Sequence, residues 1–274
     1  MRTNVPMPRV APSALPALLV ACAGGCSAPL DWDRPQDPAP SGPGYLRRYK
    51  ESHFRALGAH FRGGLTGDTF HARLADARVL YLGDHHADVH LHARMLDLLA
   101  ELDQAGIDYH LGLECIGVQD EPAVGRFLAG ECDLDALVAE LRARWSDTWL
   151  AADDVDSAFY RELLLHARRR RRPAFALEPT PRLPLFERDQ VIARTVLRRA
   201  RQHPHALVVV VIGETHLLGF GQLVKRVGLP HVAIGANLST ALRASAARTT
   251  FTAEHRFAES ESGVLFALPF EPAP

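Results

Sequence analysis

Little in this 274-residue sequence points to a charged partner. The formal net charge is -1, so the balance of charge gives no reason to expect binding to nucleic acid or to another polyanion. Lys50 and Lys225 are the only lysines among 31 basic residues. We attribute this bias toward arginine to genomic base composition rather than to phosphate recognition.

Several signatures of known chemistries are also missing. No Cys-x-x-Cys-His stretch occurs, which disfavours covalent c-type haem, and no Gly-x-Ser-x-Gly elbow occurs, which disfavours a classical serine hydrolase. The glycines of residues 216–223 lack the full Gly-x-Gly-x-x-Gly spacing of a dinucleotide site. What is present is the composition of a globular protein, with 47% hydrophobic and 23% charged residues.

The first residues resemble a bacterial export signal. Arg2 and Arg9 precede a short apolar stretch that has the length of a signal-peptide core and is too short to span a bilayer. Leu19-Val20-Ala21-Cys22 resembles a lipobox, in which the cysteine is lipidated, and Cys26 is a second candidate. An ordinary cleaved secretory signal is the alternative. The lipobox predicts a membrane-anchored lipoprotein of the bacterial cell envelope, at the outer membrane or the periplasmic face.

We divide the chain into three parts. Residues 1–26 are the expected signal peptide and lipobox, and residues 27–44, rich in Pro, Ser, Gly and Asp, are an expected flexible tether. Residues 45–274 are the expected folded domain. Within that domain only Cys115 and Cys132 remain, and they could pair in an oxidising compartment without defining a disulfide framework.

The domain alternates short apolar runs with helical patterns from Arg78 onward. This alternation predicts an α/β fold with a mainly parallel, mixed-edge sheet flanked by helices. We expect strands at 77–83, 108–114, 173–178, 206–213, 231–236 and 263–270. We expect helices at 88–104, 133–145, 156–171, 186–202 and 219–227. The long stretch between the second and third strands predicts a small helical insertion or cap at about 118–155.

Four of the predicted strands end in acids or histidines. Because ligands of open α/β sheets bind beyond the carboxyl ends of the strands, parallel strands would bring these groups to one edge. Two of the strand ends share the pattern Gly-acid-x-His, in which we expect the acid and the histidine to project into a cleft. The four ends are Asp84-His85-His86, Glu114, Glu178 and Glu214-Thr215-His216.

The helix after the first of these motifs adds another histidine. Asp88 is a plausible N-cap. On the helical wheel His92 lies at the edge of the buried stripe, whereas His90 lies on the polar face. We therefore expect His86 and His92 to face the cleft, opposite His216, and His85 and His90 to be exposed.

The expected cleft combines histidine nitrogens with carboxylates. That donor set suits Zn, Mn, Co or Fe better than Ca or a soft thiolate metal. The candidate metal ligands are His86, His92, Glu114 and His216. Asp84 and Glu214 are acids that would bind the metal or support its ligands. Isolated polar groups at strand ends are the alternative reading.

Aromatic residues add two open questions. Trp145 and Trp149 lie in the insertion, where they either pack in a core or line a lid for a flat ligand. Tyrosine phenolate can bind ferric haem, so Tyr81, Tyr109 and Tyr160 are possible haem ligands. The sequence does not choose among them.

These motifs together resemble the ChaN-like, haem-binding uptake family of the Tiki superfamily. His86 and His92 match the two histidines of the family's opening motif, with Asp84 in place of its usual Glu. The resemblance also assigns Glu114 as the strand-end acid and Arg188 with Asp189 as the start of a later helix. "GETH" with His216 matches its late Gly-x-x-His, and "GLP" at 228–230 follows.

The resemblance spans residues 54–240 and implies two alternative functions. The first is binding of haem or iron by an envelope lipoprotein involved in haem or iron uptake, either as a monomer or as a homodimer. There Asp84, His86, His92, Glu114, Arg188 and His216 would contact the cofactor. The second is a metal-dependent hydrolase, peptidase-like or esterase-like, with Glu114 or Glu214 as the general base. A non-catalytic scaffold is a third possibility, so whether the protein is an enzyme stays open.

Overall fold

The computed structural model describes residues 43–270. Its strands are β1 (Phe61–Thr66), β2 (Val79–Asp84), β3 (Tyr109–Gly117), β4 (Ala174–Glu178), β5 (Leu207–Gly213), β6 (His231–Ile234), β7 (His255–Ser260) and β8 (Leu265–Ala267). Its helices are α1 (Pro43–Leu57), α2 (Gly67–Asp76), α3 (Val89–Gln104), α4 (Glu121–Ala129), α5 (Leu134–Arg144), α6 (Ser157–Arg170), α7 (Leu185–Gln202), α8 (Leu223–Val227) and α9 (Thr240–Ala246). Short 3-10 turns, η1 (Val118–Asp120) and η2 (Glu214–His216), follow β3 and β5.

The strands form one sheet in the order β1-β7-β8-β6-β2-β5-β3-β4. The strands from β8 to β4 pair in parallel, and β7 pairs antiparallel with both β8 and β1 at one edge. The expected α/β fold with a mainly parallel, mixed-edge sheet is therefore confirmed. All residues of β2, β3 and β5 are buried, as expected for central strands covered on both faces.

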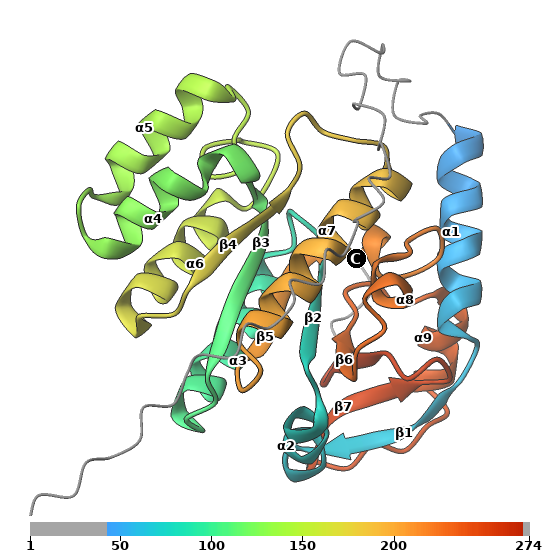
Figure 1. Cartoon of the computed structure of the whole chain (residues 1–274). Helices are drawn as coiled ribbons and strands as arrows, with labels where there is room; N and C mark the ends of the chain where they lie inside the picture. Colours follow the sequence, from blue (N-terminus) through green and yellow to red (C-terminus); the bar gives the residue numbers. More distant parts are fainter. Residues whose placement is uncertain (1–42, 271–274) are drawn as a thin grey trace, which may run out of the picture. The chain divides into compact units, whose positions relative to one another are not determined.

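Helices cover the sheet on both faces (Figure 1). Alternate residues of each strand point to opposite faces, so Leu80 packs in one core with α3 and α6, while Val79 packs in the other with α7. The register pairs Asp84 of β2 with Gly213 of β5. This pairing places the carboxyl ends of these two strands at the same level, which brings their motifs together.

The segment between β3 and α6 is helical, as expected. It contains η1, α4 and α5, followed by turns that lead into α6. Figure 1 shows α4 and α5 in green, beside α6. The backbone N–H of Asp156, at the end of this segment, donates to the carbonyl of His86 at 2.8 Å. The segment is thus fixed to the loop that follows β2.

The structure differs from the sequence-based expectation at several places. The strand β3 continues to Gly117, and α1, β1, α2, α9 and β7 were not expected. The helix expected at 219–227 starts only at Leu223, because Gly219 has φ of +66° and a Cβ on Gly221 would lie 2.4 Å from the backbone of His216. Cys115 and Cys132 are free thiols, so they do not pair.

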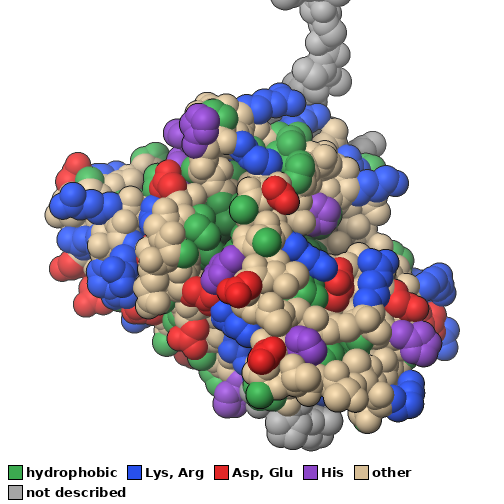
Figure 2. Space-filling model, turned by 90° about the horizontal axis from the view of Figure 1, so that it is seen from below, with side chains coloured by type: hydrophobic (Ala, Val, Ile, Leu, Met, Phe, Trp, Pro, Cys, Tyr) green, Lys and Arg blue, Asp and Glu red, His purple; other side chains and the backbone are tan. Residues whose placement is uncertain are grey.

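Two observations concern the surface and the termini. Acidic, basic and histidine side chains are intermixed on the face that Figure 2 shows. In residues 43–270, no helix has the length and hydropathy needed to cross a bilayer. Cys22, Cys26, the signal and residues 27–42 of the tether lie outside the described residues. The helix α1 begins at Pro43, two positions before the expected start of the domain.

Candidate functional site

A cleft of about 410 Å³ opens at the carboxyl ends of β3 and β4. Glu114 and Glu178 line it from the strands, and Trp145 and Trp149 line it from the turns after α5. The remaining lining residues are Gln119, Arg144, Ser146, Asp147, Pro179, Thr180 and Arg182. The cleft therefore combines two aromatic walls, two arginines and buried carboxyl groups. The tryptophans, for which core packing was the alternative, are half-buried at its wall.

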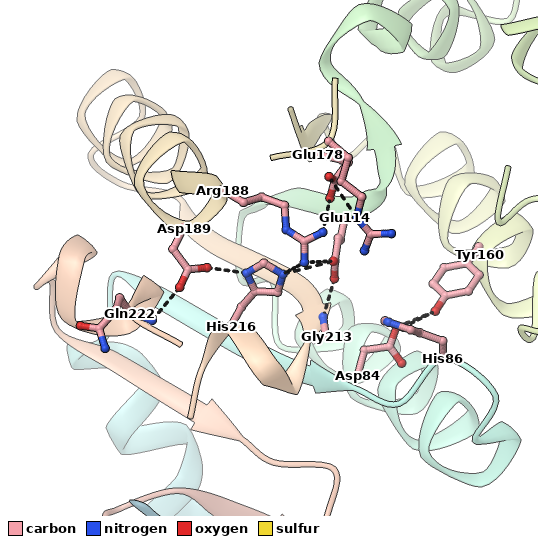
Figure 3. Close-up of polar contacts among 11 residues, drawn as sticks. Asp84, His86, Glu114, Tyr160, Glu178, Arg188, Asp189, Gly213, His216 and Gln222 are labelled. Carbon is pink, nitrogen blue, oxygen red and sulfur yellow. Dashed lines mark hydrogen bonds and ion pairs between the residues drawn. The ribbon is translucent and has the colours of Figure 1, made fainter. Parts of the chain in front are cut away.

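The first polar cluster surrounds Asp84 at the end of β2 (Figure 3). Tyr160 donates its hydroxyl to Asp84 Oδ2 at 2.6 Å. His86 Nδ1 lies 3.0 Å from the same oxygen and 3.1 Å from the Tyr160 hydroxyl. Burial opposes ionisation of Asp84, but hydrogen bonds from His86, His92 and Tyr160 outweigh it and lower the pKa of Asp84 to about 2.

These contacts fix the proton of His86. The Tyr160 hydroxyl donates its hydrogen bond to Asp84. Toward His86, the tyrosine oxygen and the carboxylate oxygen can therefore only accept, so His86 Nδ1 must carry the hydrogen and donate. In the neutral ring Nε2 then holds a lone pair. That nitrogen lies on the Gly213 side, 3.4 Å from where a Cβ on Gly213 would be. The His86 side chain is 35% exposed and its ring lies 4.2 Å from the ring of Trp149, next to the cleft.

His92 lies behind His86 and away from the cleft. Its Nε2 is 2.8 Å from Asp84 Oδ1, its Nδ1 is 2.8 Å from Asp156 Oδ2, and its ring stacks on Phe159. Burial lowers the pKa of His92, but its hydrogen bonds to Asp84 and Asp156 raise it by more. A ring that donates from both nitrogens has no lone pair for a metal. His92 therefore positions Asp84.

The second polar cluster is centred on Glu114 in β3. Its Oε2 accepts from the backbone N–H of Gly213 at 2.6 Å. Its Oε1 lies 3.5 Å from Arg188 Nη2 and 3.3 Å from His216 Nε2. Burial raises the pKa of Glu114, but the charges of His216 and Arg188 and the hydrogen bond from His216 bring it well below the usual range. Glu114 is therefore a buried carboxylate.

His216 contacts Asp189 through its Nδ1 atom, and Arg188 and Glu114 through its Nε2 atom. Its Nδ1 bonds Asp189 Oδ1, and its Nε2 lies 2.5 Å from Arg188 Nη2. Burial lowers the pKa of His216, whereas Glu114 and Asp189 raise it by more. Its Nε2 can donate to Glu114 when protonated and accept from Arg188 when neutral. The second oxygen of Asp189 accepts from the backbone N–H of Gln222 at 2.6 Å, which fixes the acid.

Helix α7 supplies the charges of this second cluster. Arg188 and Asp189 lie near the start of α7, where the backbone N–H of Arg188 donates to the carbonyl of Pro184. Both side chains are buried. They reach the carboxyl ends of β3 and β5 because α7 begins at that edge, after the connection formed by residues 179–184. Figure 3 shows both side chains extending from α7 toward His216.

Glu214 is turned away from the cleft. Its Oε1 accepts from the backbone N–H of Ala236 at 2.8 Å, and its Oε2 accepts from Asn237 Nδ2 at 2.9 Å. His53 Nε2 of α1 lies 3.4 Å from Oε2. Burial raises the pKa of Glu214 to about 7, against the opposing hydrogen bonds from Asn237 and Ala236. The expectation that both motif acids project into the cleft is therefore wrong for Glu214.

The predicted site residues thus fall into two clusters and one outlier. Asp84, His86 and His92 form the first cluster, and Glu114, Arg188 and His216 form the second. Within residues 43–270 no group of three or more His, Cys, Asp or Glu side chains has the arrangement of a metal site. His85 and His90 are exposed, as expected.

Several residues that complete the clusters were not in the predicted set. Asp156 and Glu178 were missed as site residues, although Glu178 had been noted at a strand end. Tyr160 had been considered only as a haem ligand. Neither Tyr81 nor Tyr109 lines the cleft, and burial raises the pKa of both hydroxyls above its usual range. Asp156 and Tyr160 lie at the start of α6, far along the chain from β2, so only the fold brings Asp156 to His92 and Tyr160 to Asp84.

Comparison with known proteins supports the family resemblance. Residues 70–183 match the profile of the family described as haem-binding uptake, Tiki superfamily, ChaN. No curated protein matches the sequence.

Solved structures with a similar chain trace include three of different kinds. The type III effector HopBA1 shares 18% identity with a TM-score of 0.48, covering 77% of this chain and 96% of that chain. The structure of cofacial haem binding to ChaN of Campylobacter jejuni shares 12% identity with a TM-score of 0.44, covering 64% and 87%. RRSP, a MARTX toxin effector domain from Vibrio vulnificus CMCP6, shares 19% with a TM-score of 0.45, covering 70% and 42%. Likenesses at this level carry no argument about function.

Proposed function

We propose that the cleft is the ligand site of a hydrolase that works by acid–base catalysis, starting from the match of residues 70–183 to the ChaN family of the Tiki superfamily. The observation that supports this most directly is the hydrogen bonding of His86. Its Nδ1 proton is held by an ionised Asp84, its Nε2 lies beside Gly213, and its ring packs against Trp149 at the wall of the cleft. A histidine oriented by a buried carboxylate is the usual arrangement of a general base.

His86 would activate a water molecule. The Nε2 lone pair takes a proton from water, and the imidazolium that forms is stabilised by Asp84 through Nδ1. Because Tyr160 and His92 both donate to Asp84, the carboxylate stays ionised and in one orientation. The ring proton would therefore remain on Nδ1 throughout the reaction.

The second cluster would stabilise negative charge on the substrate. Arg188 and His216 are buried hydrogen-bond donors next to Glu114. Helix α7 positions Arg188, and Asp189 holds His216 through its Nδ1 atom. Donors that are fixed before the reaction and shielded from water stabilise a developing oxyanion strongly. Ester and peptide carbonyls are the substrate groups that need this combination of a base and an oxyanion site.

A metal ion fits the described arrangement poorly. The two nitrogens of His92 both bind acids, and His216 is occupied by Asp189 and Arg188. The predicted set of His86, His92, Glu114 and His216 stays a prediction, and no catalytic step depends on it here. Activity that resists chelators and is not raised by Mn, Co or Zn is the outcome expected from the arrangement of His92 and His216.

The first test is the replacement His86→Ala in the full chain. We expect kcat/KM on a panel of ester and peptide substrates to fall by about 10²–10⁴-fold, as for the loss of a general base. His85→Ala is the matched control, because His85 is the exposed neighbour of His86. Equal activity in both variants and the wild type would refute the role of His86.

Haem binding is a second candidate, favoured by the family match and by the walls of the cleft. Trp145 and Trp149 offer flat apolar surfaces, and Arg144 and Arg182 at the cleft are 36% and 59% exposed, so they can pair with carboxylates. Among the residues that line or adjoin the cleft, His86 Nε2 is of the ligand type that holds haem iron. A bound haem would supply redox or ligand-storage chemistry.

Absorption spectroscopy separates the two candidates. Adding haemin to the full chain should shift and sharpen the Soret band if the cleft binds haem, and His86→Ala should reverse that shift. A spectrum equal to that of free haemin, together with ester or peptide hydrolysis, would exclude haem binding and support the hydrolase. Binding without hydrolysis would favour uptake.

We further propose that the protein is a lipoprotein anchored in the bacterial envelope. This rests on the lipobox-like sequence before Cys22, with Cys26 as the second candidate. Replacing Cys22 by Ala should move the protein from the membrane fraction to the soluble fraction. Retention in the membrane fraction by Cys22→Ala, and its loss in Cys26→Ala, would assign the second cysteine.

A further inference from the structure

Glu178 is a buried carboxyl group in the cleft that no step described so far uses. It is the last residue of β4, its side chain is 7% exposed, and it lines the cleft. Within residues 43–270 its Oε1 makes no hydrogen bond. The nearest cation to Oε1 is Arg182 Nε at 3.6 Å, and Arg182 is mostly exposed and therefore free to move aside. Buried polar atoms without a hydrogen bond are rare and point to a ligand.

Two carboxyl groups share the charge of one buried arginine. Arg188 Nη1 lies 3.5 Å from Glu178 Oε2, and Arg188 Nη2 lies 3.5 Å from Glu114 Oε1. Glu114 also accepts from the Gly213 backbone and contacts His216, whereas Glu178 has no comparable donors. Glu114 is thus the better stabilised anion of the two.

The surroundings of Glu178 shift its pKa upward, toward the protonated form. Burial raises the pKa of Glu178, Arg188 and Arg182 lower it, and the negative charge of Glu114 raises it, with a net increase. His216 also acts to lower it. Two neighbouring carboxyl groups whose pKa values are pushed apart are the usual source of an acid and a base in one site.

The order of the strands places this acid opposite the base. His86 follows β2, Gly213 ends β5, Glu114 lies in β3 and Glu178 ends β4, in the order in which these strands lie side by side. His86 and Glu178 therefore lie on opposite sides of the second polar cluster, which is centred on Glu114.

We propose that Glu178 is a catalytic residue, the general acid that protonates the leaving group of the substrate from its Oε1 atom. This inference rests on the proposed hydrolase. His86 Nε2 takes a proton from water, and the hydroxide oxygen bonds to the carbonyl carbon. As the bond from that carbon to the leaving oxygen or nitrogen breaks with its electron pair, Glu178 gives its proton to that atom. Solvent reprotonates Glu178, and His86 returns its proton to solvent. The carboxylic acid product releases its own proton to solvent and leaves as an anion.

The role of Glu178 defines a class of substrate. An acid is needed only where the leaving group is a poor one, as in amides and alkyl esters, because an aryl oxide leaves without a proton. The cleft would therefore favour peptides or alkyl esters over activated esters. The aromatic walls of Trp145 and Trp149 add a preference for a flat group next to the scissile bond.

The kinetic test uses two esters with the same acyl group, one with an aryl and one with an alkyl leaving group. In the full chain, Glu178→Gln should lower kcat for the alkyl ester by about 10²-fold or more and for the aryl ester by less than about 10-fold. The fall of kcat/KM at high pH should also be lost in the variant. Glu187→Gln is the matched control, because Glu187 is exposed in the first turn of α7.

Equal losses for both esters overturn the role of Glu178 while leaving the hydrolase intact. If the wild type hydrolyses neither ester nor any peptide, the proposed hydrolase fails and the catalytic role of Glu178 fails with it. Infrared difference spectra give a readout that does not need turnover. The carbonyl band of a protonated carboxyl at pH 6 should be weaker in Glu178→Gln than in the wild type, and an unchanged band would refute the proton on Glu178.

Discussion

The two Gly-acid-x-His motifs look alike in the sequence but serve different purposes in the structure. In the first, Asp84 binds its own motif histidine, His86, and holds it at the cleft. In the second, Glu214 turns away toward Asn237 and His53, and His216 takes its acid from Asp189 on another helix. The same pattern thus gives a paired acid and histidine in one case and a separated acid and histidine in the other.

The difference is one of environment. Asp84 accepts from three side chains, two of them histidines, so its charge is favoured. Glu214 accepts mainly from neutral amides in a buried setting, so its neutral form is favoured. Two acids at equivalent motif positions are therefore shifted in opposite directions from their ordinary pKa values. Motif identity alone does not assign a charge state.

The largest effect is expected from Asp84→Ala. Removing the carboxylate leaves the buried His92 and the Tyr160 hydroxyl without their acceptor, which should lower the free energy of unfolding by about 4 kcal/mol. Urea unfolding at pH 7 measures this. A loss of less than about 1 kcal/mol would show that the first cluster does not depend on its acid.

Glu214→Gln tests the opposite behaviour of the second motif. The folded-state pKa of Glu214 is about 7, above its ordinary 4.5, so between these values the folded chain holds a proton that the unfolded chain has lost. The stabilising effect is complete below pH 4.5 and falls as the pH rises to 7, by on the order of 3 kcal/mol.

Glutamine cannot ionise, so this decline in unfolding free energy should be absent from Glu214→Gln. Unfolding of both proteins across pH 4.5–8 measures it. For Asp84 the sign is reversed, because its lowered pKa gives stability that is present above its ordinary value of 3.8 and lost as the pH falls through about 2. If the unfolding free energies of the wild type and of Glu214→Gln change with pH in the same way, the assignment of a proton to Glu214 is wrong.

Tyr160→Phe should have the smallest effect of the three. It removes one hydrogen bond to a charged carboxylate, so the free energy of unfolding should fall by about 2 kcal/mol. The control is His90→Ala, an exposed position where a change within about 0.5 kcal/mol is expected. Thermal unfolding distinguishes these, and a Tyr160→Phe protein as stable as the control would remove Tyr160 from the first cluster.

Strand positions, the parallel core and the helix with His92 could be predicted from the sequence. The continuous run of valines in β5 and the buried stripe of α3 are local signals, and local signals survive without the rest of the fold. The antiparallel strands β1 and β7 gave weaker signals, because β1 contains two glycines and β7 mixes charged and apolar residues. Their pairing depends on contacts that are distant in sequence.

The sequence by itself determined which chemical groups meet at the carboxyl edge of the sheet, because each follows a strand and parallel strands end together. Only the tertiary structure decided their partners and protonation. Tyr160 reaches Asp84 from α6, Asp156 reaches His92 from the N-cap of α6, and Asp189 reaches His216 from α7, each across many residues of intervening chain. A pKa depends on burial and on the atoms within a few ångströms, and neither is set until the chain is folded.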